Sequence, residues 1–409
     1  MFVRLPAFVL ILVGLAAAGP AWGAVDKGKT EADFRRWLDT DIRLEARRAG
    51  ISSRTLDQVL GSIRLDWSLP DLATTKIKTQ QQSEFRSPAA YFKQSRLSSL
   101  ASAGRKQLAR WDRTLDTIEQ RFGVPRRVII AIWARESDFG RAKLPHNALR
   151  ALATEAFIGR RKASFRPEFL AALKIVDQGH IPAEQMKSSW AGALGHPQFL
   201  PSSFLQYAVD FDGDNRRDIW GSVPDALASI ANYLKQNGWQ SGRDWGFEAN
   251  VPSKVACTLE GPDKGGNISD WVRLGVKRVS GRPFPKGEQG RKGFLLMPGG
   301  RFGPAYIATP NFYVLKTYNE SDLYALFIGH LADRFGADRP FVGQWQVPGG
   351  FNRRDVQLMQ QRLEKKGYDV GGADGLVGFK TRVSVGLWQE KAGLPPTCFP
   401  DAKLVRSIR

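Results

Sequence analysis

The sequence contains little cysteine and little histidine. Two cysteines in 409 residues, Cys257 and Cys398, allow at most one intramolecular disulfide. They lie far apart in the chain, so two separate buried thiols are at least as good an interpretation as a bond, and the pairing stays open. The few histidines have no metal-ligand spacing, which argues against a zinc-dependent amidase or peptidase. They are His146, His180, His196 and His330.

Acidic residues and long hydrophobic runs are also scarce. There are 40 Asp and Glu against 60 Lys and Arg, which gives a formal charge of +20. This imbalance indicates an anionic partner: nucleic acid, an acidic lipid surface or an acidic polysaccharide. The single long apolar run at the N-terminus excludes a polytopic membrane protein. With 42% hydrophobic residues, 12 Trp and 24 Phe, the chain is predicted to fold into two or three domains rather than to be disordered.

The apolar run has the features of an export signal. Arg4 precedes it, and small residues, Ala21 and Gly23, stand where a signal peptidase cleaves. Residues 1–23 are therefore predicted to be a cleaved signal peptide, with an uncleaved anchor as the alternative. No cysteine lies near the cleavage site, which argues against a lipoprotein. A periplasmic protein without integral membrane association is expected, and export argues against a nucleic-acid partner.

The mature chain changes character along its length. Apolar residues recur at helical spacing from about residue 30 to 242, and again over 321–334. Between them, at about 251–315, Gly and Pro become frequent. Short β-prone runs appear there at 293–297, 305–308 and 312–315, and they predict a small inserted sheet. The fold class is therefore predominantly α, with a small β region.

The C-terminal part is predicted to be a separate small domain. After a domain spanning 24–337, a linker at 338–351 leads to a compact unit at 352–409. That unit has a helix ended by Gly367, an Asp-Gly turn at 374–375 and a second helix bearing Trp388. The order and spacing of these residues resemble the peptidoglycan-binding domain of bacterial wall enzymes, a three-helix fold, with Ser384 in place of the usual Ala.

Glu136 is the most informative residue of the large domain. It follows Ile129, Ile132 and Trp133 at i+7, i+4 and i+3, so it is expected on the buried face of a helix that ends near Gly140. Partial burial would keep the carboxyl protonated, as a general acid requires. The competing interpretation is a solvated residue in the last turn or an ion pair with an arginine.

Most glycosidases use two facing carboxylates. The nearest second candidate, Asp138, stands at i+2 and is expected to point away from Glu136. If Glu136 is catalytic, the spacing therefore favours a single acid, with the nucleophile supplied by the substrate.

Further motifs carry a family resemblance. Arg135-Glu-Ser-Asp-Phe-Gly140, the Gly195-His-Pro-Gln-Phe-Leu-Pro-Ser-Ser203 stretch and Ala231-Asn-Tyr-Leu-Lys-Gln-Asn-Gly-Trp239 closely resemble the membrane-bound lytic transglycosylase B family. The resemblance implies a lysozyme-like catalytic domain that cleaves the β-1,4 bond between N-acetylmuramic acid and N-acetylglucosamine in peptidoglycan strands. It also implies that Glu136 protonates the glycosidic oxygen and then acts as base, which closes a 1,6-anhydro ring.

The same resemblance assigns residues to substrate binding. It implies that polar residues line the cleft, that tyrosines and an asparagine contact the sugars, and that an arginine pair binds the carboxylates of the peptide stem. Without the family motif, these side chains would be interpreted as loop caps, core aromatics and solvated surface. The residues are Ser189, Gln198, Tyr233, Tyr318, Asn319, Tyr324, Arg160 and Arg161. No cofactor is required, and partner enzymes of the wall stay unidentified.

An acidic loop resembles the EF-hand-like calcium site of the family. Its carboxylates stand at loop positions 1, 3, 5 and 9, as Asp210, Asp212, Asp214 and Asp218. Asn215 replaces the usual turn glycine, and Gly221 stands at position 12, where a carboxylate normally closes the site. Weak calcium binding and an ordered acidic turn without metal are both open.

Two alternatives to a lytic transglycosylase remain. One is a hydrolytic muramidase on the same fold, and the other is a peptidoglycan-binding scaffold without catalysis. The presence of Glu136, Ser189, Gln198 and Asn319 argues against the scaffold.

Overall fold

A computed structural model describes residues 26–72 and 88–408 of the chain. The predicted signal peptide, 1–23, lies outside the described residues. The chain divides into two compact units, and the border between them crosses α5 (Gln94–Arg110). We call residues 26–72 and 107–236 the helical unit, and residues 88–106 and 237–408 the mixed unit.

The helical unit consists of helices, several of which are capped by a side chain at the N-terminus. The side chain of Asn147, for example, accepts a hydrogen bond from the Arg150 N–H and starts the helix that follows it. A two-stranded ladder pairs His146 with Ser188. Its helices are α1 (Lys27–Trp37), α2 (Arg43–Arg48), α3 (Ser53–Leu60), α6 (Asp112–Phe122), α7 (Arg126–Ser137), α8 (Ala148–Phe157), α9 (Lys162–Asp177), α10 (Pro201–Tyr207) and α11 (Val223–Gln236), with a π-helical turn η1 (Leu38–Ile42), a 3-10 turn η3 (Ala183–Gln185) and strands β1 (His146–Asn147) and β2 (Lys187–Ser188).

The mixed unit is built around an antiparallel five-stranded sheet of order β4-β6-β7-β3-β5. Ile307 of the central strand lies between Phe247 and Leu295 of its two neighbours, and all three are buried. Trp271 packs into the same core. The strands are β3 (Gly246–Asn250), β4 (Gly266–Asn267), β5 (Lys277–Arg278), β6 (Lys292–Leu296) and β7 (Ala305–Ala308), with α12 (Ile268–Arg273) and short 3-10 turns η4 (Cys257–Leu259), η5 (Pro262–Lys264), η6 (Lys286–Glu288) and η7 (Gly300–Phe302).

The prediction of a predominantly helical chain with a small β region is confirmed, but one predicted strand is wrong. Residues 312–315 lie in a helix, α13 (Pro310–Lys316). The Thr309 hydroxyl accepts a hydrogen bond from the Asn311 N–H, and Pro310 occupies the first helical position, where its fixed φ favours a helix start. This capping signal outweighs the β propensity of Phe312, Tyr313 and Val314. The sheet itself spans 246–308.

The remaining helices of the mixed unit include the three that form the C-terminal domain. α4 (Pro88–Tyr91) and α14 (Asp322–Gly336) belong to the larger part of the unit, and α15 (Arg353–Lys365), α16 (Phe379–Lys391) and α17 (Ala402–Ser407) to the C-terminal domain. Asn352 and Asp355 form a reciprocal capping box at the start of α15. Ser384, the departure from the family pattern, is buried and donates a hydrogen bond of 2.7 Å to the Asp369 carbonyl.

The C-terminal domain is covalently joined to the region that carries the sheet. Cys257 of η4 and Cys398 form a disulfide, which settles the pairing that the sequence left open. Nearby, the guanidinium of Arg382 on α16 forms ion pairs with Glu260 at 2.7 Å and Asp322 at 2.8 Å. All three side chains are buried. The domain and the sheet region thus share one interior within the mixed unit.

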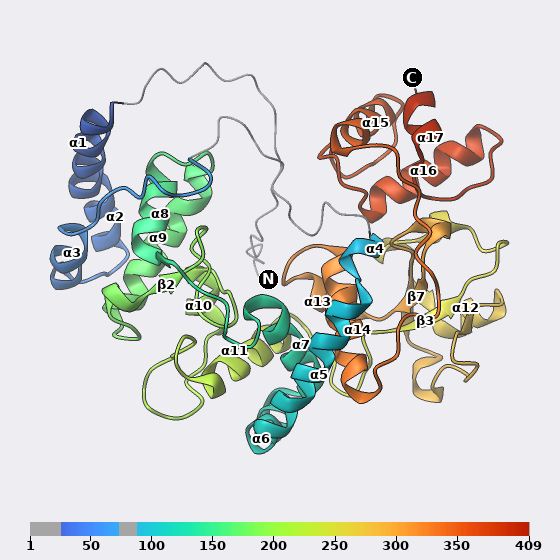
Figure 1. Cartoon of the computed structure of the whole chain (residues 1–409), viewed down its shortest axis with the longest axis horizontal. Helices are drawn as coiled ribbons and strands as arrows, with labels where there is room; N and C mark the ends of the chain where they lie inside the picture. The colour runs from blue at the N-terminus through green and yellow to red at the C-terminus, as the bar shows by residue number, and fades with distance from the viewer. Residues whose placement is uncertain (1–25, 73–87, 409) are drawn as a thin grey trace. The chain divides into compact units, whose positions relative to one another are not determined.

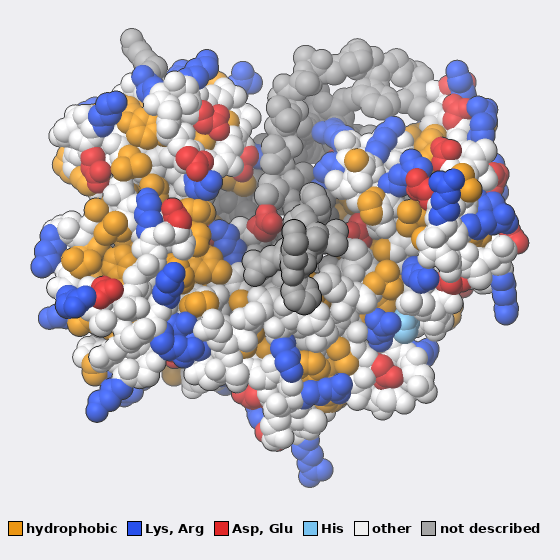
Figure 2. All heavy atoms as spheres, turned by 180° about the vertical axis from the view of Figure 1, so that it is seen from behind, with side chains coloured by type: hydrophobic (Ala, Val, Ile, Leu, Met, Phe, Trp, Pro, Cys, Tyr) orange, Lys and Arg blue, Asp and Glu red, His pale blue; other side chains and the backbone are white. Residues whose placement is uncertain are grey.

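Basic side chains are spread over the described surface. On the face seen in Figure 2, Lys and Arg occur throughout and alternate with hydrophobic and acidic groups. The excess charge on this face is therefore distributed and does not form one dense stripe. None of the helices within 26–72 and 88–408 combines the length and hydrophobicity needed to span a membrane.

Candidate active site

Glu136 is the next-to-last residue of α7, a largely buried helix of the helical unit. Residues 128–134 are buried on every face because α7 packs against both α6 and α11. The sequence predicted one buried face for this helix, whereas the structure buries it on all faces. Glu136 itself is half-buried. A buried helix thus presents this carboxyl group at an end that is partly open to solvent.

The turn after Glu136 is unusual in its backbone. Asp138, Phe139 and Gly140 have φ values of 49°, 58° and 80°, so three successive residues are left-handed and α7 ends at Ser137 rather than near Gly140. The Ser137 hydroxyl accepts a hydrogen bond of 3.1 Å from the Gly140 N–H. The exposed carboxylate of Asp138 forms an ion pair with Arg141 at 2.9 Å. The acid nearest to Glu136 in the sequence is therefore already engaged by a cation.

His196 joins this turn to the loop that carries Gln198. A Cβ atom on Gly140 would lie 2.5 Å from His196 Nε2, so only glycine fits there. The imidazole also stacks on Trp133, with ring centroids 5.8 Å apart, and burial lowers the pKa of His196. The histidine therefore serves as a neutral packing surface between the end of α7 and the loop.

Ser189 and Gln198 lie in two consecutive tight turns. The Ser189 hydroxyl accepts a hydrogen bond of 3.1 Å from the Ala193 N–H, and Leu194 and Phe199 pair in a short antiparallel bridge. Gln198 has a left-handed φ of 56°, and its side-chain amide donates a hydrogen bond of 2.7 Å to the Gly195 carbonyl. Both predicted polar residues are half-buried, and both help to hold the backbone of the loop.

Tyr233 lies in an aromatic cluster beneath this loop. It is buried on α11, and its ring centroid is 4.7 Å from Tyr207 and 5.7 Å from Phe199. Because Phe199 follows Gln198 directly, the cluster supports the backbone of the polar loop. The packing of Tyr233 is that of a core aromatic, and a sugar contact by this residue stays a prediction.

The predicted arginine pair adjoins a buried acid that the sequence reasoning missed. Arg160 is exposed and lies 4.0 Å from the Asp71 carboxylate, whereas Arg161 is half-buried. Glu155 is completely buried on α8, and burial, together with the Asp71 charge, raises its pKa to about 7 although Arg161 and Arg160 oppose the rise. Within the described residues, neither Glu155 carboxylate oxygen has a hydrogen-bond donor. A single acid within the largely apolar run 151–157 was the sequence signal for this group.

Three carboxylates converge in the acidic loop. Ligand atoms of Asp210, Asp212 and Asp214 lie within 4.8 Å of one another, whereas Asp218 is not part of this group. Asp218 instead accepts hydrogen bonds from the Trp220 and Gly221 N–H groups. The loop is thus ordered by Asx-type turns whether or not a cation binds.

Asp225 organises the base of the acidic loop. Its N–H donates to the Ser222 hydroxyl at the start of α11. Its buried carboxylate, however, accepts hydrogen bonds from the Phe211, Asp212 and Asp218 N–H groups. Burial raises the pKa of Asp225, and these three donors oppose the rise. No spacing in the sequence predicted this role.

The late tyrosine and asparagine candidates belong to the mixed unit. Tyr318 is half-buried, and Asn319 is exposed in the turn between α13 and α14. Tyr324 is buried on α14 and stacks on Tyr318, with centroids 6.2 Å apart and planes 13° from parallel. The structure therefore brings these three candidates together, and separately gathers Glu136, Ser189, Gln198 and Tyr233 in the helical unit.

Comparison with known proteins decides the family. Residues 33–333 match the model of the transglycosylase SLT domain, and residues 352–408 match that of a putative peptidoglycan binding domain. The chain belongs to the transglycosylase SLT domain family. The family resemblance inferred from the motifs, and with it the assignment to this class of enzymes, is confirmed.

Individual relatives support this family assignment. Membrane-bound lytic murein transglycosylase B of Escherichia coli is 32% identical over 225 residues, 54% of this chain and 60% of that protein. SltB3 of Pseudomonas aeruginosa, solved in complex with NAG-NAM-pentapeptide, is 37% identical, with a TM-score of 0.83 over 92% of this chain and 99% of that one. SltB1 of the same organism is 26% identical, with a TM-score of 0.58 over 75% of this chain and 98% of that one. These likenesses confirm the lysozyme-like helical fold with its C-terminal domain.

Proposed function

We propose that this transglycosylase cleaves the β-1,4 bond between N-acetylmuramic acid and N-acetylglucosamine in peptidoglycan and leaves a 1,6-anhydromuramic acid end. Glu136 first donates its proton to the glycosidic oxygen. It then takes the proton of the muramic 6-hydroxyl, whose oxygen attacks the anomeric carbon and closes the ring. The substrate acetamido group stabilises the positive charge at that carbon.

The observation that carries this proposal is the placement of the acids around α7. Glu136 is half-buried at the open end of a buried helix, whereas Asp138 is engaged by Arg141 at the surface. Glu155 is fully buried and cannot touch a polymer. A pair of facing carboxylates, the usual requirement of glycosidases, is thus not formed by these acids, which favours a single acid and an internal nucleophile.

The polar residues around Glu136 are proposed to bind the glycan. Ser189 and Gln198 lie on a loop whose backbone is held against α7 through His196. The loop therefore holds the donors and acceptors of these two side chains in a defined orientation. Tyr233 is proposed to support this loop. In the mixed unit, Asn319 is proposed to position the acetamido group beside the stacked Tyr318–Tyr324 pair. Crystals of the relative SltB3 in complex with NAG-anhNAM-pentapeptide support an anhydro product for this chain as well.

Arg160 and Arg161 are proposed to bind a carboxylate of the peptide stem. The charge of Arg160 is exposed. A terminal nitrogen of Arg161 lies buried, without a hydrogen-bond acceptor among the described residues, so it has the capacity to take a new acceptor. This is an unusual state for a guanidinium, because buried donors are normally satisfied.

Digestion of purified sacculi tests the activity. Mass spectrometry of the soluble muropeptides distinguishes 1,6-anhydro ends from reducing ends, because an anhydro end lacks one water. We expect anhydro products from the wild-type chain and a loss of rate of at least about 100-fold for Glu136→Gln. Asp138→Asn is the matched control and should retain activity. Reducing-end products would identify a hydrolase, and an active Glu136→Gln variant would refute the assignment.

We propose that the acidic loop binds calcium weakly. Asp210, Asp212 and Asp214 supply hard oxygen ligands, but Arg216 pairs with Asp214 at 3.1 Å and Gly221 offers no bidentate carboxylate. A stabilised EF-hand normally has both a free fifth-position ligand and that closing carboxylate. Calcium at about 5 mM should saturate even a weak site of this kind. The Tm measured with calcium should therefore exceed the Tm measured with EDTA, and Asp212→Asn should abolish the difference. An equal Tm in both buffers would mean an acidic turn without metal.

We also propose export to the periplasm by cleavage after residue 23. N-terminal sequencing of the protein recovered from the periplasmic fraction should begin at Ala24. A chain that retains Met1, or that fractionates with the cytoplasm, would refute the proposal.

A further inference from the structure

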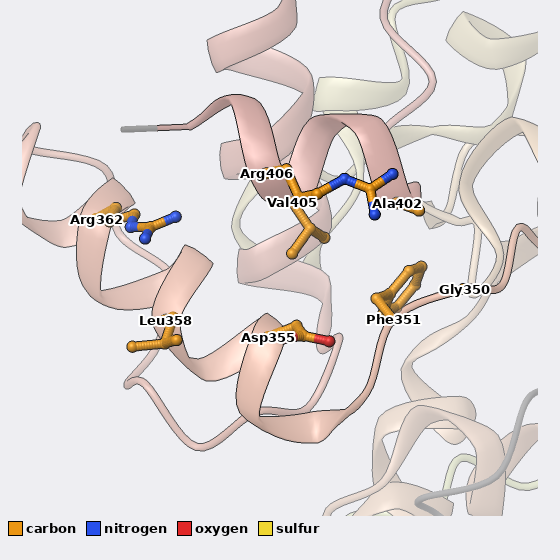
Figure 3. A pocket seen from close by; sticks show the side chains of 8 residues that line it. All are labelled: Gly350, Phe351, Asp355, Leu358, Arg362, Ala402, Val405 and Arg406. Carbon is orange, nitrogen blue, oxygen red and sulfur yellow. The ribbon is translucent and has the colours of Figure 1, made fainter.

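A pocket opens on the C-terminal domain between α15 and α17. Its volume is about 260 Å³, and all of its lining residues lie between 350 and 406 (Figure 3). Phe351, Leu358 and Val405 supply apolar walls. Leu358 is 38% exposed, a large hydrophobic side chain left uncovered on α15. The pocket therefore offers a small apolar surface at a place where the domain core ends.

Two guanidinium groups border the same pocket. In Figure 3 Arg362 lies on α15 and Arg406 on α17, on either side of Val405. Arg362 donates a hydrogen bond of 3.0 Å to the Ile408 carbonyl through one nitrogen, which fixes the side chain and leaves its other N–H groups. Arg406 is exposed. Asp355 also lines the pocket, and one of its oxygens accepts the Asn352 N–H in the helix cap. Two cations against one anion leave the pocket net positive.

This combination fits a carboxylate that is attached to a small apolar group. Guanidinium groups bind carboxylates through charge-assisted hydrogen bonds, often in bidentate geometry. A neutral sugar offers only hydroxyl groups and would give neither guanidinium a charged partner. The limited volume suits the end of a chain rather than its middle. The apolar walls suit an aliphatic side chain next to the carboxylate.

We propose that this pocket binds the free carboxylate end of a peptidoglycan stem peptide, with Arg406 as the carboxylate ligand and Arg362 adding to the positive charge of the pocket. The proposal rests on the proposed function, because peptidoglycan is the polymer that brings such peptides to the chain. It assigns peptide recognition, rather than glycan recognition, to the C-terminal domain. The catalytic machinery around Glu136 takes no part in it.

Peptide binding by the full chain tests the proposal directly. The probe is a fluorescently labelled pentapeptide stem, offered as the free acid and as the C-terminal amide, with affinity measured by fluorescence anisotropy. All variants carry Glu136→Gln. We expect Arg406→Gln to weaken binding of the acid about five- to ten-fold, as the loss of one charge-assisted hydrogen bond at a partly exposed site would. Arg354→Gln, on the exposed side of α15, removes the same charge outside the pocket and should change affinity less than two-fold.

The amide probe separates the carboxylate from the rest of the peptide. It should bind more weakly than the acid, and Arg406→Gln should weaken it no further. Equal binding of acid and amide, or equal effects of Arg406→Gln and Arg354→Gln, would overturn the proposal. Because Arg406 is exposed, its substitution should leave the Tm unchanged, which separates lost binding from lost folding.

Sacculi stripped of their peptides by an amidase decide between peptide and glycan. Retention on intact sacculi should fall in the Arg406→Gln variant, and retention on stripped glycan should equal that of Arg354→Gln. A defect that persists on stripped glycan would mean that the pocket binds the glycan, through its sugars or through the lactyl carboxylates that the amidase exposes, and would contradict the proposal. Digestion with Glu136 intact keeps the two proposals apart. If anhydro products form but Arg406→Gln does not change peptide binding, only the proposed role of the pocket is refuted. If no products form, the proposed function is refuted.

Discussion

The buried charge cluster around Arg382 links the C-terminal domain to the rest of the mixed unit, and its removal is a defined perturbation. The guanidinium donates to both Glu260 oxygens, at 2.7 and 2.9 Å, and to Asp322 at 2.8 Å. Arg382→Met keeps the unbranched stem and deletes the charge. Asp322 then keeps its ion pair with Lys316 at 2.8 Å. Among the described residues, Glu260 keeps the Met297 N–H as its remaining partner.

The size of the stability loss follows from this difference between Asp322, which keeps a cation, and Glu260, which does not. Glu260 is 1% exposed, so the variant leaves a carboxylate buried with its countercharge gone. Breaking a buried ion pair on one side costs about 3–5 kcal/mol, and we expect the free energy of unfolding to fall by that amount at pH 7. Lys380→Met, on the same helix, is the matched control. Its pair with Asp369 is exposed and should contribute less than about 1 kcal/mol.

The assay is urea unfolding of the full chain, followed by tryptophan fluorescence and by calorimetry. A chain of two units need not unfold in one step, so the transition of the mixed unit is the one to compare. Adding Glu260→Gln to Arg382→Met should recover part of the loss, because the double variant no longer buries a lone charge. A loss below about 1 kcal/mol for Arg382→Met, equal to that of Lys380→Met, would refute the reasoning.

The same cluster has a defined pH dependence. Burial alone would raise the pKa of Asp322, but the adjacent Lys316 and Arg382 charges lower it from 3.8 to about 2. An acid with a depressed folded-state pKa stabilises the fold above its unfolded value and loses that contribution as the pH falls through the folded one. The gap between wild type and Arg382→Met should therefore be full above about pH 4 and shrink towards pH 2. A gap that widens on acidification would contradict this assignment.

Two further outcomes test other buried groups. Replacing both Cys257 and Cys398 by serine opens a covalent loop that spans a sequence separation of 141 and should lower the free energy of unfolding by up to about 5 kcal/mol. A wild-type Tm that is the same with and without dithiothreitol would contradict this. Glu155 has its pKa raised from 4.5 to about 7, so its stabilising contribution is lost as the pH rises through that interval. Glu155→Gln should match wild type near pH 4 and exceed its stability by on the order of 3 kcal/mol at pH 8, measured by thermal melts, and a gain that is independent of pH would refute the role of its charge.

Local signals explain most of what the sequence predicted correctly about the fold. Leu115, Ile118 and Phe122 recur at helical spacing and are the buried face of α6. Ser321 caps α14, at the point where the apolar spacing over 321–334 predicted that helix resumes. The error at 312–315 arose where β propensity and a capping signal compete over the same residues. The cap prevails because the fixed φ of Pro310 and the hydrogen bond to the Thr309 hydroxyl favour the first helical turn.

The candidate site was predicted less completely because burial depends on what packs around a residue. Glu136 stood out by its motif, and the structure places it at the open end of a helix buried on all sides. Glu155 carries no motif, and only the packing around α8 makes it a fully buried acid with a raised pKa. Asp225 carries no motif either, and only the return of the acidic loop brings three N–H donors to its carboxylate.

The sequence by itself determined the family, the helical character of the chain, the place of the small β region and the identity of the candidate acid, because motifs and apolar periodicity are local properties. Tertiary structure alone decided whether Cys257 and Cys398 pair, which carboxylates meet Arg382, and where a net positive pocket opens between α15 and α17. Each of these joins residues that are distant in the chain. Their contact energies exist only after the chain has closed the intervening loops, so no local pattern records them.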